Sequence, residues 1–328
     1  MGIPSQFARA ILREHRYRPI TGALLSISRQ TVYLNPEQAC DLVREELGTP
    51  PRVQSQGLEL DVWTRGAQAK RFISDRAFYS LFSDADYNCV DVTPYEGATL
   101  IANLCNPLPA EIEGQFDFIV NGSSLDNIFD PAMALRNLSR LLKPGGRIIH
   151  LERASRAHNV YVAFALSWFH DYYAINNFED CQAYLVQWDI NTVESRWDVY
   201  RYSPVLEREG RIEYFGEDCY YYPHRGAHCL VLAEKGQQST WEKSPIQFGY
   251  RPGMQQKLFD GQWTLPPQTL PADEDDPYFR SALRFFRSER SAIVSVAEKV
   301  SLPDHLFYYA PQIPYCGSIH PVGDAVRQ

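Results

Sequence analysis

Four side chains of this sequence can act as a general base at a site made from strand ends. Asp126 and Glu152 each follow a short apolar run, and His158 and His170 lie near an aromatic segment. A hydroxyl acceptor has a high pKa, so a reaction at a hydroxyl requires a carboxylate or an imidazole within hydrogen-bond reach. We prefer His170, because a helix covering the site would aim its ring inward. Glu152 has an alternative role, which is to satisfy a helix end or an arginine.

The elements that must position these residues are clearest in the tract Gln115–Glu152. Phe116–Val120 has the length and β-branched character of a buried parallel strand. Asp130-Pro131 then supplies an N-cap and a first helical residue, and apolar residues recur after it at helical spacing. Lys143–Gly146 ends that helix, and Arg147–Leu151 resumes as a strand. Strand, helix and strand in this order predict half of a doubly wound α/β sheet.

The tract reads QFDFIVNGSSLDNIFDPAMALRNLSRLLKPGGRIIHLE. It resembles the second half of class I S-adenosylmethionine-dependent methyltransferases, in which LLKPGG precedes the fifth strand. The resemblance implies a Rossmann-like, doubly wound, mostly parallel sheet with an antiparallel last strand, expected at Cys229–Ala233. It also implies S-adenosylmethionine as cofactor. Ligands of such sheets bind outside the carboxyl ends of the strands, so Asn121, Gly122 and Ser123 are expected to contact the cofactor.

The resemblance extends upstream through the second and third strands. NCVDV is the expected second strand, and Asp91 at its end stands where family members bind the ribose hydroxyls of the cofactor. Val92 follows Asp91 and is included among the expected contacts. A short connection leads to the expected third strand, Ala98–Leu104, where Asn103 and Leu104 fall near the adenine.

The expected first strand, Gly22–Ser28, departs from the family. Family members carry an acidic residue in this strand and a glycine-rich turn after it, because glycine lets the backbone approach the methionine part of the cofactor. Here Ser26 stands near the acidic position and Ser28 near the first glycine. Arg29 and Gln30 follow with long side chains, and these four residues are the cofactor contacts expected in this segment. The departure marks either a subgroup or a loss of cofactor binding.

Three further helices are expected outside the tract. Met1–Arg18 and Ser74–Phe82 show apolar residues on one face of a helix. Pro36–Leu47 begins with an N-cap, Asn35, followed by proline at the first helical position, and Gly48 ends it.

The chain is expected to consist of one domain and an extension. Residues 1–238 form the Rossmann-like domain, with a surface insertion over about 49–73 and cover helices over about 156–180. Within the latter, Val160–Tyr173 is aromatic and apolar nearly all round, so a helix there must cover another part of the domain. Residues 239–328 are rich in proline and aromatic side chains, and we expect them to pack on the domain or to form a homodimer contact.

Charge and hydropathy argue against two classes of partner. Charged residues make up 22% of the 328 residues and the net charge is −8, which offers no basic surface for nonspecific binding of nucleic acid. No apolar run approaches the roughly 20 residues that span a bilayer, and no signal-like core begins the chain. We therefore predict a soluble, cytoplasmic protein. The seven cysteines form no CxxC pair, so we predict reduced thiols and no metal site.

Three functions from different classes remain open. The first is a methyltransferase that acts on a hydroxyl of a small molecule or a surface glycan, as the similar subgroup suggests. The second is a non-catalytic, methyltransferase-like binding or assembly protein, in which Arg29 and Gln30 fill the cofactor groove. The third is another nucleotide-using Rossmann enzyme, although the sequence contains neither GxGxxG nor a YxxxK pair.

Overall fold

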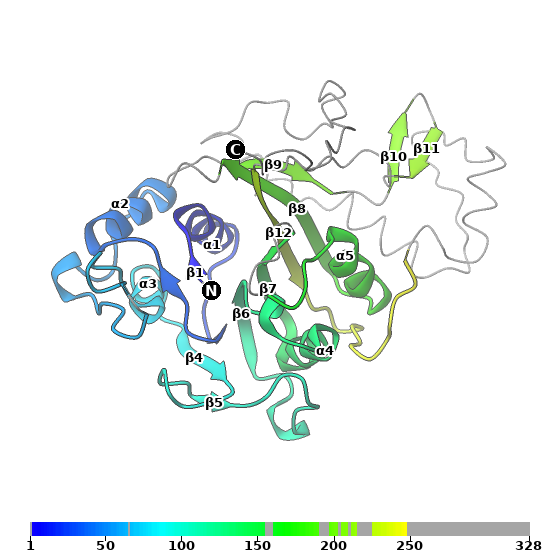
Figure 1. The fold of residues 1–328 in the computed structure, drawn as a ribbon, viewed down its shortest axis with the longest axis horizontal. Helices are drawn as coiled ribbons and strands as arrows, with labels where there is room; N and C mark the ends of the chain where they lie inside the picture. Colours follow the sequence, from blue (N-terminus) through cyan, green and yellow to red (C-terminus); the bar gives the residue numbers. More distant parts are fainter. Residues whose placement is uncertain are drawn as a thin grey trace, which may run out of the picture.

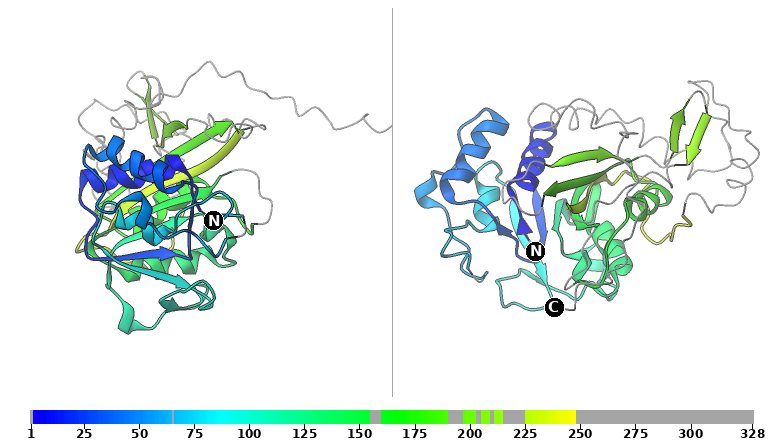
Figure 2. Two further views of the ribbon diagram at one scale, coloured as in Figure 1. Left: turned by 90° about the vertical axis from the view of Figure 1, so that its left-hand side faces the viewer. Right: turned by 45° about the horizontal axis from the view of Figure 1, so that its top comes forward.

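A central sheet of eight strands carries helices on both faces (Figure 1, Figure 2). The computed structural model describes residues 2–247, apart from 65, 155–159, 190–196, 203–204, 209–210 and 215–224. The strands of the sheet, in chain order, are β2 (Ala23–Ile27), β4 (Asp86–Asp91), β5 (Leu100–Ile101), β6 (Phe116–Gly122), β7 (Leu142–Arg153), β8 (Asp180–Asp189), β9 (Asp198–Arg201) and β12 (Arg225–Glu234). In space their order is β5-β4-β2-β6-β7-β12-β8-β9.

The strand order reverses between β2 and β6. From β2 the chain moves outward through β4 to β5, then returns to pair β6 with the other side of β2. All pairs from β5 to β7 are parallel, whereas β12 is antiparallel to both β7 and β8. The predicted doubly wound sheet with an antiparallel last strand is therefore confirmed. The edge strand β9 and two small two-stranded sheets, β1 (Gly2–Ile3) with β3 (Thr31–Val32) and β10 (Val205–Arg208) with β11 (Arg211–Tyr214), were not foreseen.

The five described α-helices are α1 (Ser5–Tyr17), α2 (Pro36–Leu47), α3 (Asp75–Ser80), α4 (Pro131–Leu141) and α5 (Leu166–Ile175). Three of them, α2, α3 and α4, begin at a residue whose side chain caps the helix. Asn35 and Gln38 form a capping box at the start of α2, and Gly48 ends it with a φ of 69°. Asp130 accepts a hydrogen bond from the Met133 N–H at the start of α4. The predicted bounds of α2 are confirmed.

Two apolar layers hold the helices on the sheet. Strand β6 shows the alternation that separates them, because Phe118 and Val120 lie in the layer under α1, α2 and α3, whereas Ile119 lies in the layer under α4 and α5. A register irregularity between Phe116 and Phe118 lets Phe116 also join the second layer. With both faces covered, the carboxyl edge is where a ligand can approach the parallel strands.

Three predicted boundaries are wrong. The third strand spans two residues rather than Ala98–Leu104. The cover helix begins at Leu166 rather than at Val160, because the Tyr161 N–H bonds to the Asp126 carbonyl and the Phe164 N–H to the Arg153 carbonyl, which fixes this segment in an extended path. Helix α4 ends at Leu141, and the KPGG tract already belongs to β7.

The first residues of the expected extension pack on the domain. The Tyr172 hydroxyl donates to the Trp241 carbonyl at 3.0 Å, and the Thr240 N–H donates to the Asn176 carbonyl at 2.8 Å. Residues 248–328, including the remaining part of the extension and its expected dimer contact, lie outside the described residues.

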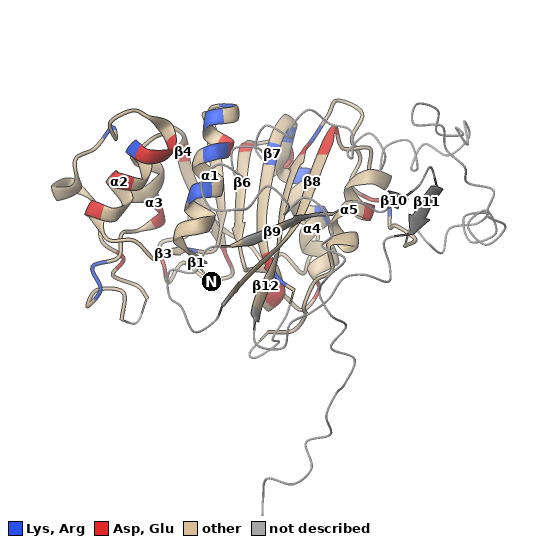
Figure 3. Ribbon diagram, turned by 90° about the horizontal axis from the view of Figure 1, so that it is seen from above, with Lys and Arg blue, Asp and Glu red and all other residues tan. Residues whose placement is uncertain are grey.

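Buried ion pairs join α1 to its neighbours. Figure 3 shows basic residues, in blue, along α1. Arg13 is 6% exposed and its Nε donates to Glu46 of α2 at 2.7 Å. Arg147 of β7, 4% exposed, pairs with Glu14 of α1, which is 1% exposed. Such pairs are costly to form, and they are costlier to break on one side because the other charge stays buried.

We expect Arg147→Met to lower the free energy of unfolding by about 3 kcal/mol, because Glu14 would be left buried without its cation. The double variant with Glu14→Gln should recover part of this loss. Urea denaturation measures both. Arg44→Met, which removes an exposed pair with Asp41, is the control and should cost less than about 0.5 kcal/mol. Equal effects of the buried and exposed variants would contradict the assignment.

Candidate functional site

The carboxyl ends of β2, β4, β6 and β7 meet at one edge of the sheet, on both sides of the point where the strand order reverses. They bring together Ser28, Asp91, Asn121 and Arg153 from distant parts of the sequence. In open α/β sheets this edge is the general position of ligands.

The turn after β2 keeps a left-handed backbone without glycine. Ser28 has a φ of 57°, and its N–H donates to the Val90 carbonyl of β4 at 2.8 Å. The fully buried Ser26 hydroxyl donates to the Ser28 carbonyl at 2.8 Å. A left-handed residue with a side chain is strained and persists where its surroundings fix it. The serine at the expected first-glycine position therefore adopts a glycine-like conformation.

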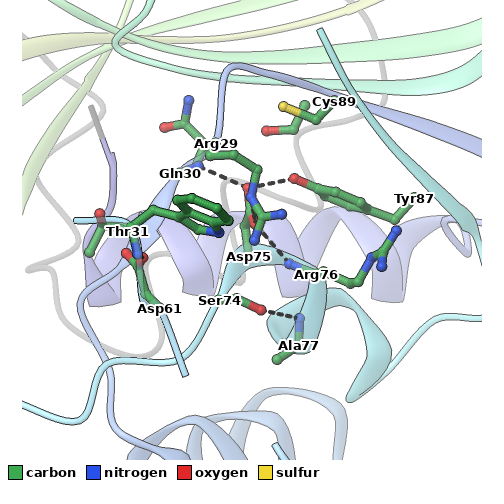
Figure 4. Close-up of polar contacts among 12 residues, drawn as sticks. Arg29, Gln30, Thr31, Asp61, Ser74, Asp75, Arg76, Ala77, Tyr87 and Cys89 are labelled. Carbon is green, nitrogen blue, oxygen red and sulfur yellow. Dashed lines mark hydrogen bonds and ion pairs between the residues drawn. The ribbon is translucent and has the colours of Figure 1, made fainter. Parts of the chain in front are cut away.

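Asp75 at the start of α3 fixes the two residues that follow this turn (Figure 4). Its Oδ2 accepts hydrogen bonds from the Gln30 N–H at 2.8 Å and from the Tyr87 hydroxyl at 2.6 Å. Its Oδ1 accepts the Arg76 N–H and pairs with Arg29 Nε, both at 2.9 Å. Complete burial raises the pKa of Asp75, against the opposing effects of the Arg29 charge and the hydrogen bonds. The Arg29 guanidinium is thereby held on Asp75.

Gln30 bridges the ends of β2 and β6. It is 2% exposed, and its Nε2 donates to the Ile27 carbonyl at 2.6 Å and to Ser124 Oγ at 3.2 Å. A Cβ added to Gly122 would lie 2.5 Å from Gln30 Oε1 and 3.1 Å from the Gly2 carbonyl oxygen. Gly122 is therefore needed for this close packing, and the Gln30 side chain occupies space at the switch point.

Glu152 at the end of β7 holds the loop that follows β6. Its Oε1 accepts Asn121 Nδ2 at 2.7 Å, the Leu125 N–H at 2.9 Å and the Ser124 N–H at 3.2 Å. Its Oε2 accepts the Asp126 N–H at 3.2 Å. These donors form the start of the short helical turn η3 (Leu125–Asn127). Burial, together with the nearby Asp126 charge, raises the pKa of Glu152 to about 8.

His150 continues this network into the helical layer. Asn121 Nδ2 lies 2.8 Å from His150 Nδ1, and His150 Nε2 lies 2.7 Å from the Tyr173 hydroxyl of α5. The amide nitrogen can only donate, so Nδ1 accepts and the proton of the neutral ring is on Nε2. Burial lowers the pKa of His150 to about 3, which keeps the ring neutral.

Asp126 is fully buried beneath the loop surface. Its Oδ2 accepts the Ser123 hydroxyl at 2.7 Å and lies 3.3 Å from Arg153 Nε, and its Oδ1 accepts Asn127 Nδ2. Burial raises its pKa, and the Ser123 hydrogen bond and the Arg153 charge oppose that shift. The carboxyl oxygens are thus already engaged, and they orient an arginine.

The expected ribose and adenine residues are split between surface and core. Asp91 is partly buried, with Oδ1 accepting the Val92 N–H at 2.6 Å, and Val92 is 61% exposed. Asn103 is exposed, and its Oδ1 accepts the Cys105 N–H at 3.0 Å. Leu104 is 5% exposed and belongs to the core, so its side chain does not face the edge.

The predicted bases do not all gather at one place. Asp126 and Glu152 meet through η3, as described above. His170 is 3% exposed on α5, which packs on β8 and β12, and its ring lies edge-on to Tyr202 at 5.4 Å. His158 lies outside the described residues.

Several residues at this edge were missed from sequence. Asp75 reads as an ordinary residue in the first turn of a helix, and its partners lie as far as 46 positions away, so no local pattern singles it out. Arg153 directly follows Glu152 and could have been found by extending the strand by one residue. Trp63 of the insertion contacts Tyr95 of the loop after β4 at a ring distance of 5.8 Å, which requires the fold to be known.

The described residues contain no group of three or more His, Cys, Asp or Glu side chains placed to hold a metal ion. In the same part of the chain, no helix combines the length and the apolar character required to cross a membrane. The cytoplasmic location stays a prediction.

Comparison with known proteins gives a match in the middle of the chain. Residues 85–150 match the family model of a methyltransferase domain. The ubiquinone/menaquinone biosynthesis C-methyltransferase UbiE of Pseudoalteromonas translucida is 38% identical over 64 residues, which cover 20% of this chain and 24% of that relative. The matched residues run from β4 into β7, so the similarity to methyltransferases covers this part of the parallel sheet and about a quarter of the relative's length.

Solved structures add little at their level of similarity. The YcgJ protein of Bacillus subtilis has a TM-score of 0.37 with 10% identity, covering 71% of this chain and 99% of that one. The 1,6-didemethyltoxoflavin-N1-methyltransferase of Burkholderia thailandensis, bound to S-adenosylhomocysteine, has a TM-score of 0.33 with 12% identity, covering 71% and 78%. These scores are too low to support an argument.

Glu152 should make the stability of the protein fall as pH rises from 7.5 to 8.5. Its pKa of about 8 in the fold lies above its ordinary value of about 4.3, so folding favours the protonated carboxyl and its contribution is lost as that proton leaves. His150 and His228 have their pKa lowered to about 3 in the fold, so they oppose this slope near their ordinary pKa of about 6.5, where the unfolded chain still binds protons. Above about pH 7.5 they are nearly neutral in both states and contribute little slope.

Urea denaturation across this pH range measures the slope, which can reach about 1.4 kcal/mol per pH unit. Glu152→Gln should flatten it, whatever that variant does to absolute stability. The exposed Glu111→Gln is the control and should leave the slope unchanged. An equal slope in wild type and Glu152→Gln contradicts the assignment.

Proposed function

We propose that the chain is an S-adenosylmethionine-dependent methyltransferase whose cofactor lies across the carboxyl ends of β2, β4 and β6. The observation that carries this proposal is Asp91, which ends β4 inside the matched segment and beside the reversal of strand order. Its Oδ1 accepts the Val92 N–H, while Oδ2 has no hydrogen-bond partner among the described residues. A partly exposed carboxylate with a free oxygen fits a ribose hydroxyl.

The residues at the other strand ends fit the remaining parts of the cofactor. Ser28 has the positive φ that a glycine would adopt, so the turn after β2 keeps the backbone shape of a glycine turn. Ser123 is also left-handed, with a φ of 63°, and ends the β6 segment against η3. Trp63 and Tyr95 are 42% and 72% exposed and offer ring surface on the Asp91 side of the edge.

When bound, S-adenosylmethionine supplies an electrophilic methyl group on a sulfonium, which passes to the acceptor by in-line displacement. The protein's main contributions are to position the acceptor and to exclude water. Glu152 fits a positioning role, because its four hydrogen bonds fix the loop from Asn121 to Asp126. Asp126 orients Arg153, and His170 is held in the helical layer. The role of these three residues in proton transfer stays a prediction.

We propose that the methyl acceptor is a hydroxyl group of a small molecule or of a surface glycan. We also propose that the protein assembles as a homodimer. The relative UbiE is named as a C-methyltransferase, so the acceptor atom is tested directly by the position of the methyl group in the product.

A second function is favoured by the position of Gln30. Its buried side chain ties the Ile27 carbonyl to Ser124 Oγ across the switch point, where a glycine turn would leave space. If that side chain excludes the methionine part of the cofactor, the protein is a non-catalytic, methyltransferase-like binding or assembly protein.

Wild-type protein should bind S-adenosylhomocysteine in calorimetry, and Asp91→Ala should weaken binding by about tenfold or more, because a carboxylate hydrogen bond to a ribose hydroxyl is lost. The matched control is Asp86→Ala, at the opposite end of the same strand, which should bind as wild type does. Thermal unfolding shows whether each variant is folded. An unchanged affinity of folded Asp91→Ala for S-adenosylhomocysteine would contradict the assignment of Asp91 to the ribose.

Gln30→Ala separates the two functions. Under the proposed function, the variant binds S-adenosylhomocysteine no more than a few fold differently from wild type, and loses about 1–2 kcal/mol of stability with its two hydrogen bonds. Gln68→Ala, in an exposed part of the insertion, is the stability control. Binding that is absent from wild type and appears in Gln30→Ala would instead establish the non-catalytic function.

A further inference from the structure

Two aromatic rings stand together on the surface beside the carboxyl ends of β6 and β7. Phe129 is 78% exposed and Tyr161 is 66% exposed, and their centroids lie 5.5 Å apart with the planes at 87°. A single exposed aromatic side chain needs no explanation, but a contacting pair at a strand-end edge indicates a binding surface.

The position of the pair is set by Asp126. The Tyr161 N–H donates to the Asp126 carbonyl at 2.8 Å, and Phe129 follows η3 in the chain. Glu152 fixes η3 through its hydrogen bonds to three N–H groups. The two rings are thus carried by a loop and a segment that are held together by backbone hydrogen bonds.

An arginine adjoins the same residue. Arg153 Nε lies 3.3 Å from Asp126 Oδ2, and the arginine side chain is 39% exposed. That is its only ion pair within the described residues, where Nε makes no hydrogen bond and the terminal nitrogens have no recorded hydrogen-bond partner. A guanidinium with available terminal nitrogens binds a carboxylate through two parallel hydrogen bonds. Because Asp126 already balances part of the charge, a ligand must be held by geometry and ring contact as well as by charge.

We propose that this surface, which we call the Phe129–Tyr161–Arg153 surface, binds a ring-shaped acceptor that carries a carboxylate. The ring lies against Phe129 and Tyr161, and the carboxylate lies on the terminal nitrogens of Arg153. Aromatic acids and uronic acids both fit, because each has a ring face that can pack on the two aromatic side chains and a carboxylate that can bind Arg153. The proposal rests on the proposed methyltransferase function for the use of the surface, but the binding itself requires no cofactor.

Binding is tested on the full chain with two acids and their neutral amides. The probes are 3,4-dihydroxybenzoate with 3,4-dihydroxybenzamide, and glucuronate with glucuronamide. Saturation-transfer NMR and calorimetry are run with and without S-adenosylhomocysteine. We expect at least one acid to bind at least about tenfold more tightly than its amide, since a charged hydrogen-bonded pair is involved. The acid that binds identifies the aromatic or the sugar source.

Variants locate the binding. Arg153→Gln should remove the preference for acid over amide, and Tyr161→Ala should weaken the acid and the amide to a similar degree. Phe129→Leu keeps an apolar side chain without the ring and should also weaken both. The control is Arg44→Gln, an exposed arginine on α2, which should change neither. If Arg153→Gln does not fold, Arg153→Lys keeps the charge but lacks the two-pronged geometry, and should bind the acid more weakly.

The outcomes distinguish this proposal from the function on which it rests. Failure to bind S-adenosylhomocysteine, with acid binding that depends on Arg153, overturns the methyltransferase proposal and leaves the surface in place. Cofactor binding with no preference for either acid overturns the surface. So does an acid preference that folded Arg153→Gln retains, or an acid affinity that folded Arg153→Lys leaves unchanged. Where both bind, the acid is incubated with S-adenosylmethionine as methyl donor, and a product heavier by one methylene unit in mass spectrometry supports the role of the surface in methyl transfer.

Discussion

The candidate site depends on a buried carboxyl at the end of β7. Glu152 collects the N–H groups of Ser124, Leu125 and Asp126, which a tight turn would otherwise bury without partners. Four hydrogen bonds offset the cost of burying the group. Because the turn is fixed, Asp126 presents its carbonyl to one segment and its carboxyl to Arg153. The loop after β6 and the segment after β7 are therefore positioned as one unit.

Much of the sheet could be predicted because parallel strands buried on both faces leave a simple signature. Most of the information lies in the apolar runs at β6 and β7 and in two helices with clear caps. These are α4 between the two strands, capped by Asp130, and α2 after β3, capped by Asn35. Boundaries failed where long-range hydrogen bonds overrode local preference. The aromatic segment after β7 reads as a helix from Val160, yet its first residues bond to η3 and β7 instead.

The site was predictable only where it lies at a strand end. Asp91 and Asn121 follow from counting along apolar runs, whereas Leu104 was misplaced because the third strand is too short to hold its register. Asp75 could not be inferred from local sequence, since its role depends on Arg29 and Gln30 in the turn after β2 and on Tyr87 in β4. The positions of strand ends can be predicted from local sequence. The side chains that lie beside those ends depend on tertiary contacts, which local sequence does not show.

The turn after β2 shows how such contacts can replace a motif. A serine in left-handed backbone costs about 1 kcal/mol relative to glycine, and this cost must be met elsewhere. Here the Val90 carbonyl fixes Ser28 from β4, while Asp75 fixes the next residues from α3. The turn after β2 thus keeps a left-handed backbone without glycine. The difference lies in the Gln30 side chain, which occupies the space beside the turn. The strands β2, β4 and β6 remain in register, so the backbone at their ends is not distorted. Cofactor binding then depends on the space that the Gln30 side chain occupies there.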